Sequence, residues 1–514
     1  MKRLATLHRL GFALLLVSRV LASGDEGTVG SQRPNVLFLA VDDLRAWVGC
    51  LEGVPGRVHT PNIDRLAARG VLFSDAHCPS PKCAPSRAAI LTGFMPSSTG
   101  LYDNGHWWYP NLPGVETLPQ RYRRAGYRVV GAGKIFHHTA GNHPPNQWDD
   151  FQPIRFRDDP WFRGSELNYP WTEPEPFPPG FPFSGVPGLP HENDWGVPPR
   201  EETQWDDHRT ADYVIEFLRN AGEKRPFFLA CGLFRPHLPW YVPQRFLDLY
   251  PLETVQLPPV LDGDLADVPP QGQAFARARE SDLKTIRAAG RLKEALRAYL
   301  ASISYADFQI GRVLDALDRS GHAENTIVVF WSDHGWHHGE KGHWHKSTLW
   351  QVATHVPLII TAPGIEPGRC RTPVSLIDLY PTLLELCGLA METQRDGQSL
   401  RPLLQAPQEP VDRAAVIEFR KGNAVVVTQR YRFIHYADGG RELYDRPDDP
   451  HEWQNLAGSP DTEGVMRLLS RFLPDRWAES KPTKRAFEFD PERFEWTNRE
   501  TGQVFRGREF RSRE

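Results

Sequence analysis

The chain has few cysteines, no asparagine-linked glycosylation sequon and no hydrophobic run that is long enough to cross a bilayer. Six Cys among 514 residues are too few for a fold that depends on disulfides. A membrane helix needs about 18 or more apolar residues, so we expect no membrane span. Lys and Arg total 60 against 64 Asp and Glu, and this balance excludes a polycation that coats nucleic acid.

The first 22 residues are typical of an export signal. Lys2 and Arg3 begin a basic stretch, residues 11–17 are apolar, and Ala22 offers a small residue for cleavage. An export signal without any Asn-X-Ser/Thr sequon predicts a bacterial periplasmic or secreted protein. We therefore assign residues 1–22 to a signal peptide.

Strand-length apolar runs alternate with amphipathic helical stretches between residues 33 and 410. Such alternation predicts an α/β domain in which helices sandwich a large, mainly parallel sheet. Within it, residues 143–199 are rich in Pro, Trp and Phe, which favours an ordered wall beside a site over a solvated linker. The expected strands are 35–41, 127–132, 226–232, 326–331 and 356–361, and the expected helices are 62–69 and 291–320.

Residues 411–514 have a different character. Short strand-like runs at 414–419, 424–428 and 431–436 are separated by turn sequences that are typical of antiparallel hairpins. A helix is expected near 464–472, followed by a charged tail. We therefore predict a smaller C-terminal α+β domain that contains an antiparallel sheet.

Polar side chains follow four of the predicted strands at the point where each strand ends. Ligand sites of open parallel sheets lie just past these carboxyl ends. Carboxylates there can hold a cation, and Lys or His can hold an anion. Each residue alone has a plainer explanation as a helix cap or a solvated group, but their convergence favours a site. They are Asp42 and Asp43 after 35–41, Lys134 and His137 after 127–132, His237 after 226–232, and Asp333 and His334 after 326–331.

The most specific motif is the pentapeptide Cys-Ala-Pro-Ser-Arg at 83–87, which Thr92-Gly93 follows. Pro85 suits a helix start and Gly93 a helix end, so Cys83 would lie at the positive end of a helix. C-x-P-S-R with a downstream T-G resembles the sulfatase signature, in which the cysteine is oxidised after translation to formylglycine. An ordinary buried thiol would not explain the whole pentapeptide.

The resemblance to sulfatases covers the chain from residue 35 to about 456 and implies an alkaline phosphatase/sulfatase-like fold, with 33–410 as the catalytic domain. The spacing G-K-x-x-H and the pair D-H favour the iduronate-2-sulfatase subgroup. The segments that carry it are N-V-L-F-L-A-V-D-D-L-R (35–45), T-P-N-I-D-R-L-A (60–67), G-K-I-F-H (133–137), F-F-L-A-C-G-L-F-R-P-H-L-P (227–239), W-S-D-H-G-W (331–336), V-A-T-H-V-P-L-I (352–359) and E-L-Y-D…D-P-H-E-W-Q-N-L (442–456).

Site roles follow from the resemblance, residue by residue. It implies one calcium ion, for which hard oxygen ligands are suited, although the softer His334 leaves the metal's identity open. The implied metal shell is Asp42, Asp43, the formylglycine from Cys83, Asp333 and His334. The implied catalytic and substrate-binding residues are Arg87, which steadies the formylglycine, Lys134 and Lys346, which stabilise the sulfuryl charge, His137 as base, His237 as sulfate ligand and acid, and Trp336 in the sugar pocket.

The resemblance also implies a mechanism and partners. A hydrated formylglycine attacks sulfur, a covalent sulfate hemiester forms, and removal of the proton from the second hydroxyl releases sulfate. The implied substrate is a sulfated uronic acid in a polysaccharide or glycosaminoglycan fragment. A formylglycine-generating or anaerobic maturation enzyme is the implied protein partner.

Several alternatives stay open at this point. A phosphonate or phosphodiester hydrolase could use the same fold, and a chain that is never matured could be a non-catalytic glycan-binding relative. Cys370 and Cys387 could form a disulfide, which their spacing does not establish. Four histidines near the site are interpreted as a solvated or substrate-facing loop in preference to a zinc site. They are His337, His338, His343 and His345.

Overall fold

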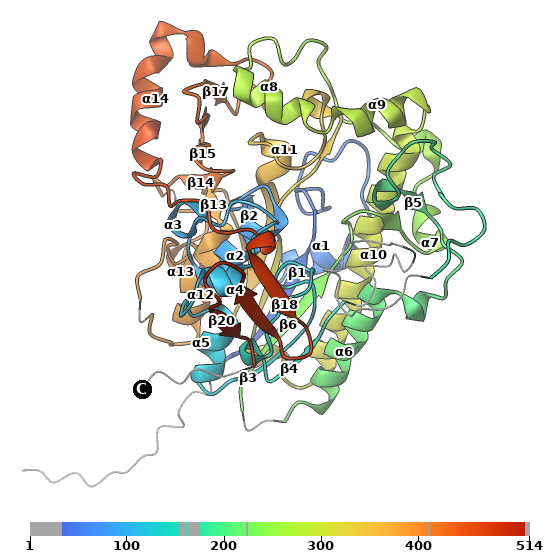
Figure 1. Cartoon of the computed structure of the whole chain (residues 1–514), viewed down its shortest axis with the longest axis vertical. Helices are drawn as coiled ribbons and strands as arrows, with labels where there is room; N and C mark the ends of the chain where they lie inside the picture. Colours follow the sequence, from blue (N-terminus) through green and yellow to red (C-terminus); the bar gives the residue numbers. More distant parts are fainter. Residues whose placement is uncertain are drawn as a thin grey trace, which may run out of the picture. The chain divides into compact units, whose positions relative to one another are not determined.

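The computed structural model describes residues 33–154, 161, 175–222, 225–391, 393–409 and 411–508 (Figure 1). The predicted signal peptide and parts of the aromatic segment 143–199 lie outside these residues. No helix in the described part of the chain is long and apolar enough to cross a membrane.

A nine-stranded sheet forms the centre of the fold. Its strands are β1 Asn35–Val41, β2 Val71–His77, β3 Arg128–Gly133, β4 Asp150–Gln152, β6 Phe227–Leu233, β8 Thr326–Ser332, β11 His355–Thr361, β12 Gly368–Cys370 and β13 Val374–Ser375. The order is β12-β2-β11-β8-β1-β6-β3-β4, and β13 pairs with β2 beside this path. Among these strands β11 alone is antiparallel to its neighbours, so the predicted mainly parallel sheet is confirmed.

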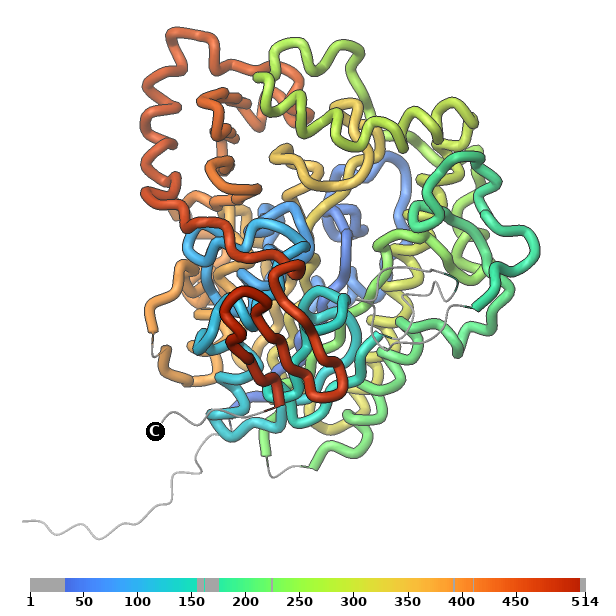
Figure 2. Tube along the Cα trace, viewed as in Figure 1, coloured from blue at the N-terminus to red at the C-terminus, as the bar shows by residue number. Residues whose placement is uncertain are grey.

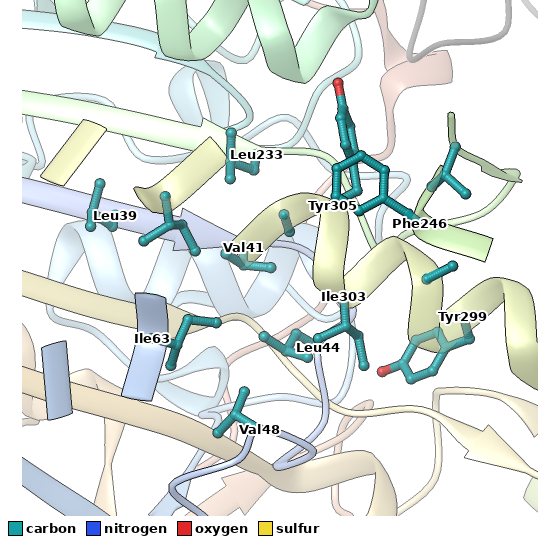
Figure 3. Close-up of a cluster of buried hydrophobic side chains, with 14 of the residues drawn as sticks. Leu39, Val41, Leu44, Val48, Ile63, Leu233, Phe246, Tyr299, Ile303 and Tyr305 are labelled. Carbon is teal, nitrogen blue, oxygen red and sulfur yellow. The ribbon is translucent and has the colours of Figure 1, made fainter. Parts of the chain in front are cut away.

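Helices cover both faces of the sheet because successive side chains of each strand point to opposite faces. On one face, Leu37 and Leu39 of β1 share a core with α10, as Figure 3 shows for Leu39 and Tyr299. On the other face, Phe38 packs with residues of α2, α5 and α12. The longer helices are α1 Pro61–Ala67, α2 Cys83–Thr92, α5 Leu118–Arg124, α6 Asp206–Asn220, α8 Pro270–Arg277, α9 Glu280–Ala288, α10 Leu292–Arg319, α12 Leu379–Leu386 and α14 Glu463–Leu469.

The described residues from 33 to 508 form one compact unit, so the boundary at residues 410–411 stays a prediction. The predicted antiparallel sheet is present as β14 Ala415–Glu418, β15 Ala424–Val427, β16 Tyr431–His435 and β17 Arg441–Asp445. It joins the large sheet through the ion pair between Arg446 and Asp75. The two sheets therefore pack into a single folded body.

The expected charged tail is wrong, because these residues form a second antiparallel sheet. Its strands are β18 Phe487–Asp490, β19 Glu495–Asn498 and β20 Val504–Arg506 (Figure 2, red). Charged residues alternate with Phe487, Trp496 and Phe505, whose rings are buried in one cluster with Trp107. The sequence analysis did not recognise the strands because charged residues outnumber the alternating apolar residues that form one face of the sheet.

All six cysteines lie in the described part and are free. The disulfide between Cys370 and Cys387 that the sequence left open does not form. The sulfur of Cys387 instead lies 3.2 Å from the hydroxyl of Tyr122 in the core.

Candidate active site

The carboxyl ends of β1, β3 and β8 bring the predicted site residues to one edge of the sheet. Asp42 and Asp43 follow β1 directly, and Asp43 has a φ of 60° where the chain leaves the strand. This turn is held from two sides. The backbone N–H of Asp43 donates to Asp333 Oδ1 at 3.1 Å, and the hydroxyl of Tyr299 donates to the Asp43 carbonyl at 2.8 Å.

Tyr299 is a positioning residue that the sequence analysis missed. It lies inside the apolar stripe of α10, where its ring is buried with the core. No motif distinguishes its hydroxyl from the hydroxyl of an ordinary core tyrosine, so the signal was absent from the sequence.

Cys83 is the first residue of α2, as the motif predicted. Gly93 ends the helix in the left-handed conformation at φ 75°. The Cys83 sulfur is buried and lies 3.1 Å from Lys346 Nζ, 3.2 Å from His334 Nε2 and 3.8 Å from Lys134 Nζ. Burial raises the pKa of the thiol. The Cys83 sulfur marks the position at which the predicted formylglycine would carry its oxygen.

Three buried carboxylates and three cations surround this sulfur. Arg87 donates to Asp333 Oδ2 at 2.8 Å and to Asp42 Oδ1 at 3.1 Å, and Lys134 pairs with Asp42. Lys346 Nζ lies 2.5 Å from Asp43 Oδ1. The predicted catalytic cations therefore meet the predicted metal ligands at one place.

The two neighbouring aspartates titrate in opposite directions. Burial by itself would raise the pKa of Asp42, but Lys134 and Arg87 outweigh it and hold that pKa below its usual range. Burial raises the pKa of Asp43 to about 7, with Asp42 adding to the rise and Lys346 opposing it. Asp43 thus carries an unfavourable negative charge in this arrangement, which a cation would stabilise.

The donor set fits a divalent cation. The ligand atoms of Asp42, Cys83, Asp333 and His334 lie within 4.8 Å of one another. Asp43 Oδ2 is buried and has no hydrogen-bond partner among the described residues, as expected for an oxygen reserved for a metal. Buried carboxylate oxygens are the ligands that calcium prefers. A second possible ligand group includes His237, which lies outside the predicted metal shell. This group comprises Asp42, Asp43, Cys83 and His237.

His237 and Trp336 lie beside the same cluster. His237 Nε2 is 3.7 Å from Asp43 Oδ2, in the loop that follows β6. Trp336 is only 1% exposed, and its ring lies 5.4 Å from Lys346 Nζ. In this structure Trp336 supports Lys346 from within, and its contact with a sugar stays a prediction.

The four histidines do not form a solvated loop, because their side chains are largely buried, and the alternative that they face the substrate stays a prediction. His337 contacts Thr348 Oγ1 at 2.6 Å and His345 pairs with Asp282 at 2.7 Å. His343 bridges the carbonyls of Ala276 and Lys346 at 2.7 and 2.9 Å. His338 stacks at 5.2 Å on Trp47. These side chains build the loop that carries Lys346.

Replacing Arg87 should destabilise the protein strongly. Arg87→Met leaves the buried carboxylates of Asp42 and Asp333 without their guanidinium, which should lower the free energy of unfolding by about 3–5 kcal/mol. Denaturant unfolding measures this loss. Arg69→Met is the control, because the exposed pair of Arg69 with Asp318 contributes at most about 1 kcal/mol. Equal losses in the two variants would contradict the expectation.

Two family models match the chain. The model described as "Sulfatase" matches residues 34–389, and the model described as "N-sulphoglucosamine sulphohydrolase, C-terminal" matches residues 339–478. The first match covers more than half of the chain and includes each of the site residues described above.

Individual proteins are also similar to this chain in sequence or in fold. A protein named "Sulfatase" from Formosa agariphila is 40% identical, over 86% of each chain. Human iduronate 2-sulfatase is 33% identical, over 91% of this chain and 88% of the human protein. The fold is similar to that of a phosphonate monoester hydrolase from Silicibacter pomeroyi, with a TM-score of 0.67, 24% identity, and coverage of 85% of this chain and 94% of that one.

Proposed function

Because this chain belongs to the sulfatase family, whose members hydrolyse sulfate esters, we propose that it removes sulfate from a sulfated uronic acid in a glycosaminoglycan or related polysaccharide fragment. The observation that carries the proposal is the position of Cys83 between Lys346, Lys134 and the buried carboxylates. The uronic acid rests on the likeness to human iduronate 2-sulfatase and on the spacing of the site motifs.

The chemistry proposed here depends on two groups. A formylglycine made from Cys83 would supply the nucleophilic oxygen, and a calcium ion held by Asp42, Asp43, Asp333 and His334 would supply positive charge beside it. We propose that a formylglycine-generating or anaerobic maturation enzyme makes the formylglycine. We also propose that residues 1–22 direct export to the periplasm or medium.

The remaining residues bind charge and move protons. Lys134 and Lys346 converge on the position of the Cys83 sulfur, where they would stabilise the negative oxygens of the transferring sulfuryl group. His237 would protonate the departing sugar oxygen. His137 would accept the proton whose removal releases sulfate. Burial, followed by the positive charges of Lys484 and Lys134, keeps the pKa of His137 far below its usual value, so its ring is neutral, as a base requires.

A substrate panel tests this proposal. Protein with formylglycine confirmed at position 83 is assayed on 2-O-sulfated uronate disaccharides, sulfated glucosamine, an aryl sulfate and an aryl phosphodiester. We expect the highest kcat/KM on the 2-O-sulfated uronate. A dominant rate on the phosphodiester would instead establish the hydrolase alternative, and binding without turnover of any ester would establish the glycan-binding alternative.

A further inference from the structure

The segment before the sheet β18–β20 runs along residues 97–105, which follow α2. Backbone N–H groups of Ala478, Lys481 and Lys484 donate to the carbonyls of Ser97, Gly100 and Gly105 at 2.7, 3.0 and 2.7 Å. This stretch also holds the start of α2, because Asn104 Oδ1 accepts from the backbone N–H of Ala84 at 2.9 Å. The C-terminal segment therefore contacts the loop next to Cys83.

Aromatic packing holds this segment in place. The ring of Trp107 lies 5.5 Å from Phe489 and 6.4 Å from Trp496, and the Lys484 ammonium lies 5.7 Å from the Trp107 ring. Trp107 Nε1 donates to the carbonyl of Ala140 at 2.7 Å. One tryptophan thus connects the C-terminal sheet, Lys484 and the loop after His137.

Lys484 reaches the proposed base through a single hydroxyl. Its Nζ donates to Thr139 Oγ1 at 2.6 Å, and the same oxygen lies 3.0 Å from His137 Nδ1. Asn142 Nδ2 also donates to Thr139 Oγ1, at 2.9 Å, and to the Thr139 carbonyl at 2.9 Å. Since a carbonyl can only accept, the amide orientation of Asn142 is determined.

The hydrogen bonds of the Thr139 hydroxyl determine the tautomer of His137. A hydroxyl oxygen accepts two hydrogen bonds and donates one. When Lys484 is an ammonium, Lys484 and Asn142 use both acceptor positions, so the hydroxyl proton must point to His137 Nδ1. The neutral ring then carries its proton on Nε2, where it can donate a hydrogen bond but cannot accept a proton.

We propose that Lys484 is a positioning residue that controls, through the hydroxyl of Thr139, whether His137 can act as a base. When Lys484 loses its proton to solvent, its nitrogen becomes an acceptor and the Thr139 hydroxyl donates to it. The Thr139 oxygen then accepts from His137 Nδ1–H. The ring proton has moved from Nε2 to Nδ1, and the free Nε2 can accept the proton whose removal releases sulfate.

The surroundings of Lys484 suit such a change. Burial lowers the pKa of Lys484 to about 8, and Asp103 opposes this shift. The other titratable groups that face it are His106 and His137, and Asp103 is itself paired with Lys82 at 2.5 Å. The lysine can therefore lose its proton in mildly alkaline solution, which an exposed lysine does not do.

The pH dependence of kcat tests this inference, which rests on the proposed function. In the wild-type protein we expect kcat to rise about tenfold across the two pH units centred on the pKa of Lys484. Lys484→Arg keeps the charge at every pH, so its kcat should be low and show no rise. Lys484→Met should also lose the rise. Arg485→Met removes an exposed cation from the same turn and should keep the wild-type profile.

Nitrogen NMR of the histidine rings tests the same inference without any turnover. With His137→Asn used to assign the signal, the wild-type ring should change from the Nε2–H to the Nδ1–H tautomer near the pKa of Lys484, and Lys484→Arg should stay Nε2–H. A change of tautomer in a protein that releases no sulfate would refute the proposed function alone. Sulfate release with a wild-type pH profile and tautomer change in Lys484→Arg would refute this inference alone.

Discussion

Cys83→Ala should reduce sulfate release by roughly 10⁴- to 10⁶-fold, as expected for the loss of a nucleophile. The substitution removes one buried sulfur at the first turn of α2 and leaves the surrounding ion pairs of Arg87 and Lys134 in place. The variant should therefore fold, and its residual activity should report chemistry and not stability. Initial rates on the preferred sulfated disaccharide give the ratio, and thermal unfolding confirms the fold.

A second buried cysteine provides the matched control. Cys231 lies in β6, and Cys231→Ala should keep activity within a small factor of the wild type. The mass of the wild-type peptide that contains residue 83 should correspond to an aldehyde in place of the thiol. Activity that survives in Cys83→Ala, or a wild-type enzyme that is fully active with an unmodified thiol, would contradict the proposed role of Cys83.

Removal of divalent cations should abolish activity and lower the melting temperature. Asp42, Asp43 and Asp333 are fully buried and lie side by side, and Asp42 raises the pKa of Asp43, so a bound divalent cation should offset the repulsion between these carboxylates. Calcium at about 100 times its Kd should stabilise the folded state by about 2.7 kcal/mol. Thermal unfolding with a chelator and after calcium is added back measures this effect independently of turnover.

Two aspartate variants show where the cation binds. Asp43→Asn should lose most of the calcium-induced rise in melting temperature. Asp307→Asn is the control, because it replaces a buried carboxylate that lies outside the cluster and accepts from the backbone N–H groups of Asn62 and Ile63. This variant should keep the full calcium-induced rise in melting temperature. A melting temperature that responds to neither chelator nor calcium would rule out the metal site.

Patterns along the chain predicted the central sheet well. The strand Asn35–Val41 was expected with the bounds that it has, because all seven residues are buried and the six after Asn35 are apolar. The bounds of the other four expected strands differ by at most one residue. Strand β2 was overlooked, since Ser74 and Asp75 interrupt its apolar run. Strand β2 accommodates these polar residues because Arg446 pairs with Asp75 and the Ser74 hydroxyl donates to the Cys370 carbonyl.

The motif at 83–87 and the polar residues at strand ends predicted most of the candidate site, and the resemblance to sulfatases added Lys346 and Trp336. Residues that are close in sequence to a strand end must lie at the sheet edge, so local pattern already implies proximity in space. The burial of His343 and its neighbours was not predictable in this way. Their partners, such as the carbonyl of Ala276, come from helices distant in sequence, and backbone acceptors leave no mark in the sequence.

The sequence by itself determined the parallel sheet, the helix at Cys83 and the polar residues at the strand ends, because each depends on short-range periodicity or spacing. The roles of Arg87 and Lys346 came from the resemblance to sulfatases. Only the tertiary structure decided that the C-terminal residues form a sheet and that Lys484 meets Thr139, 345 positions away. Such a contact depends on how two remote surfaces pack, and packing over that separation leaves no periodic signal in either segment.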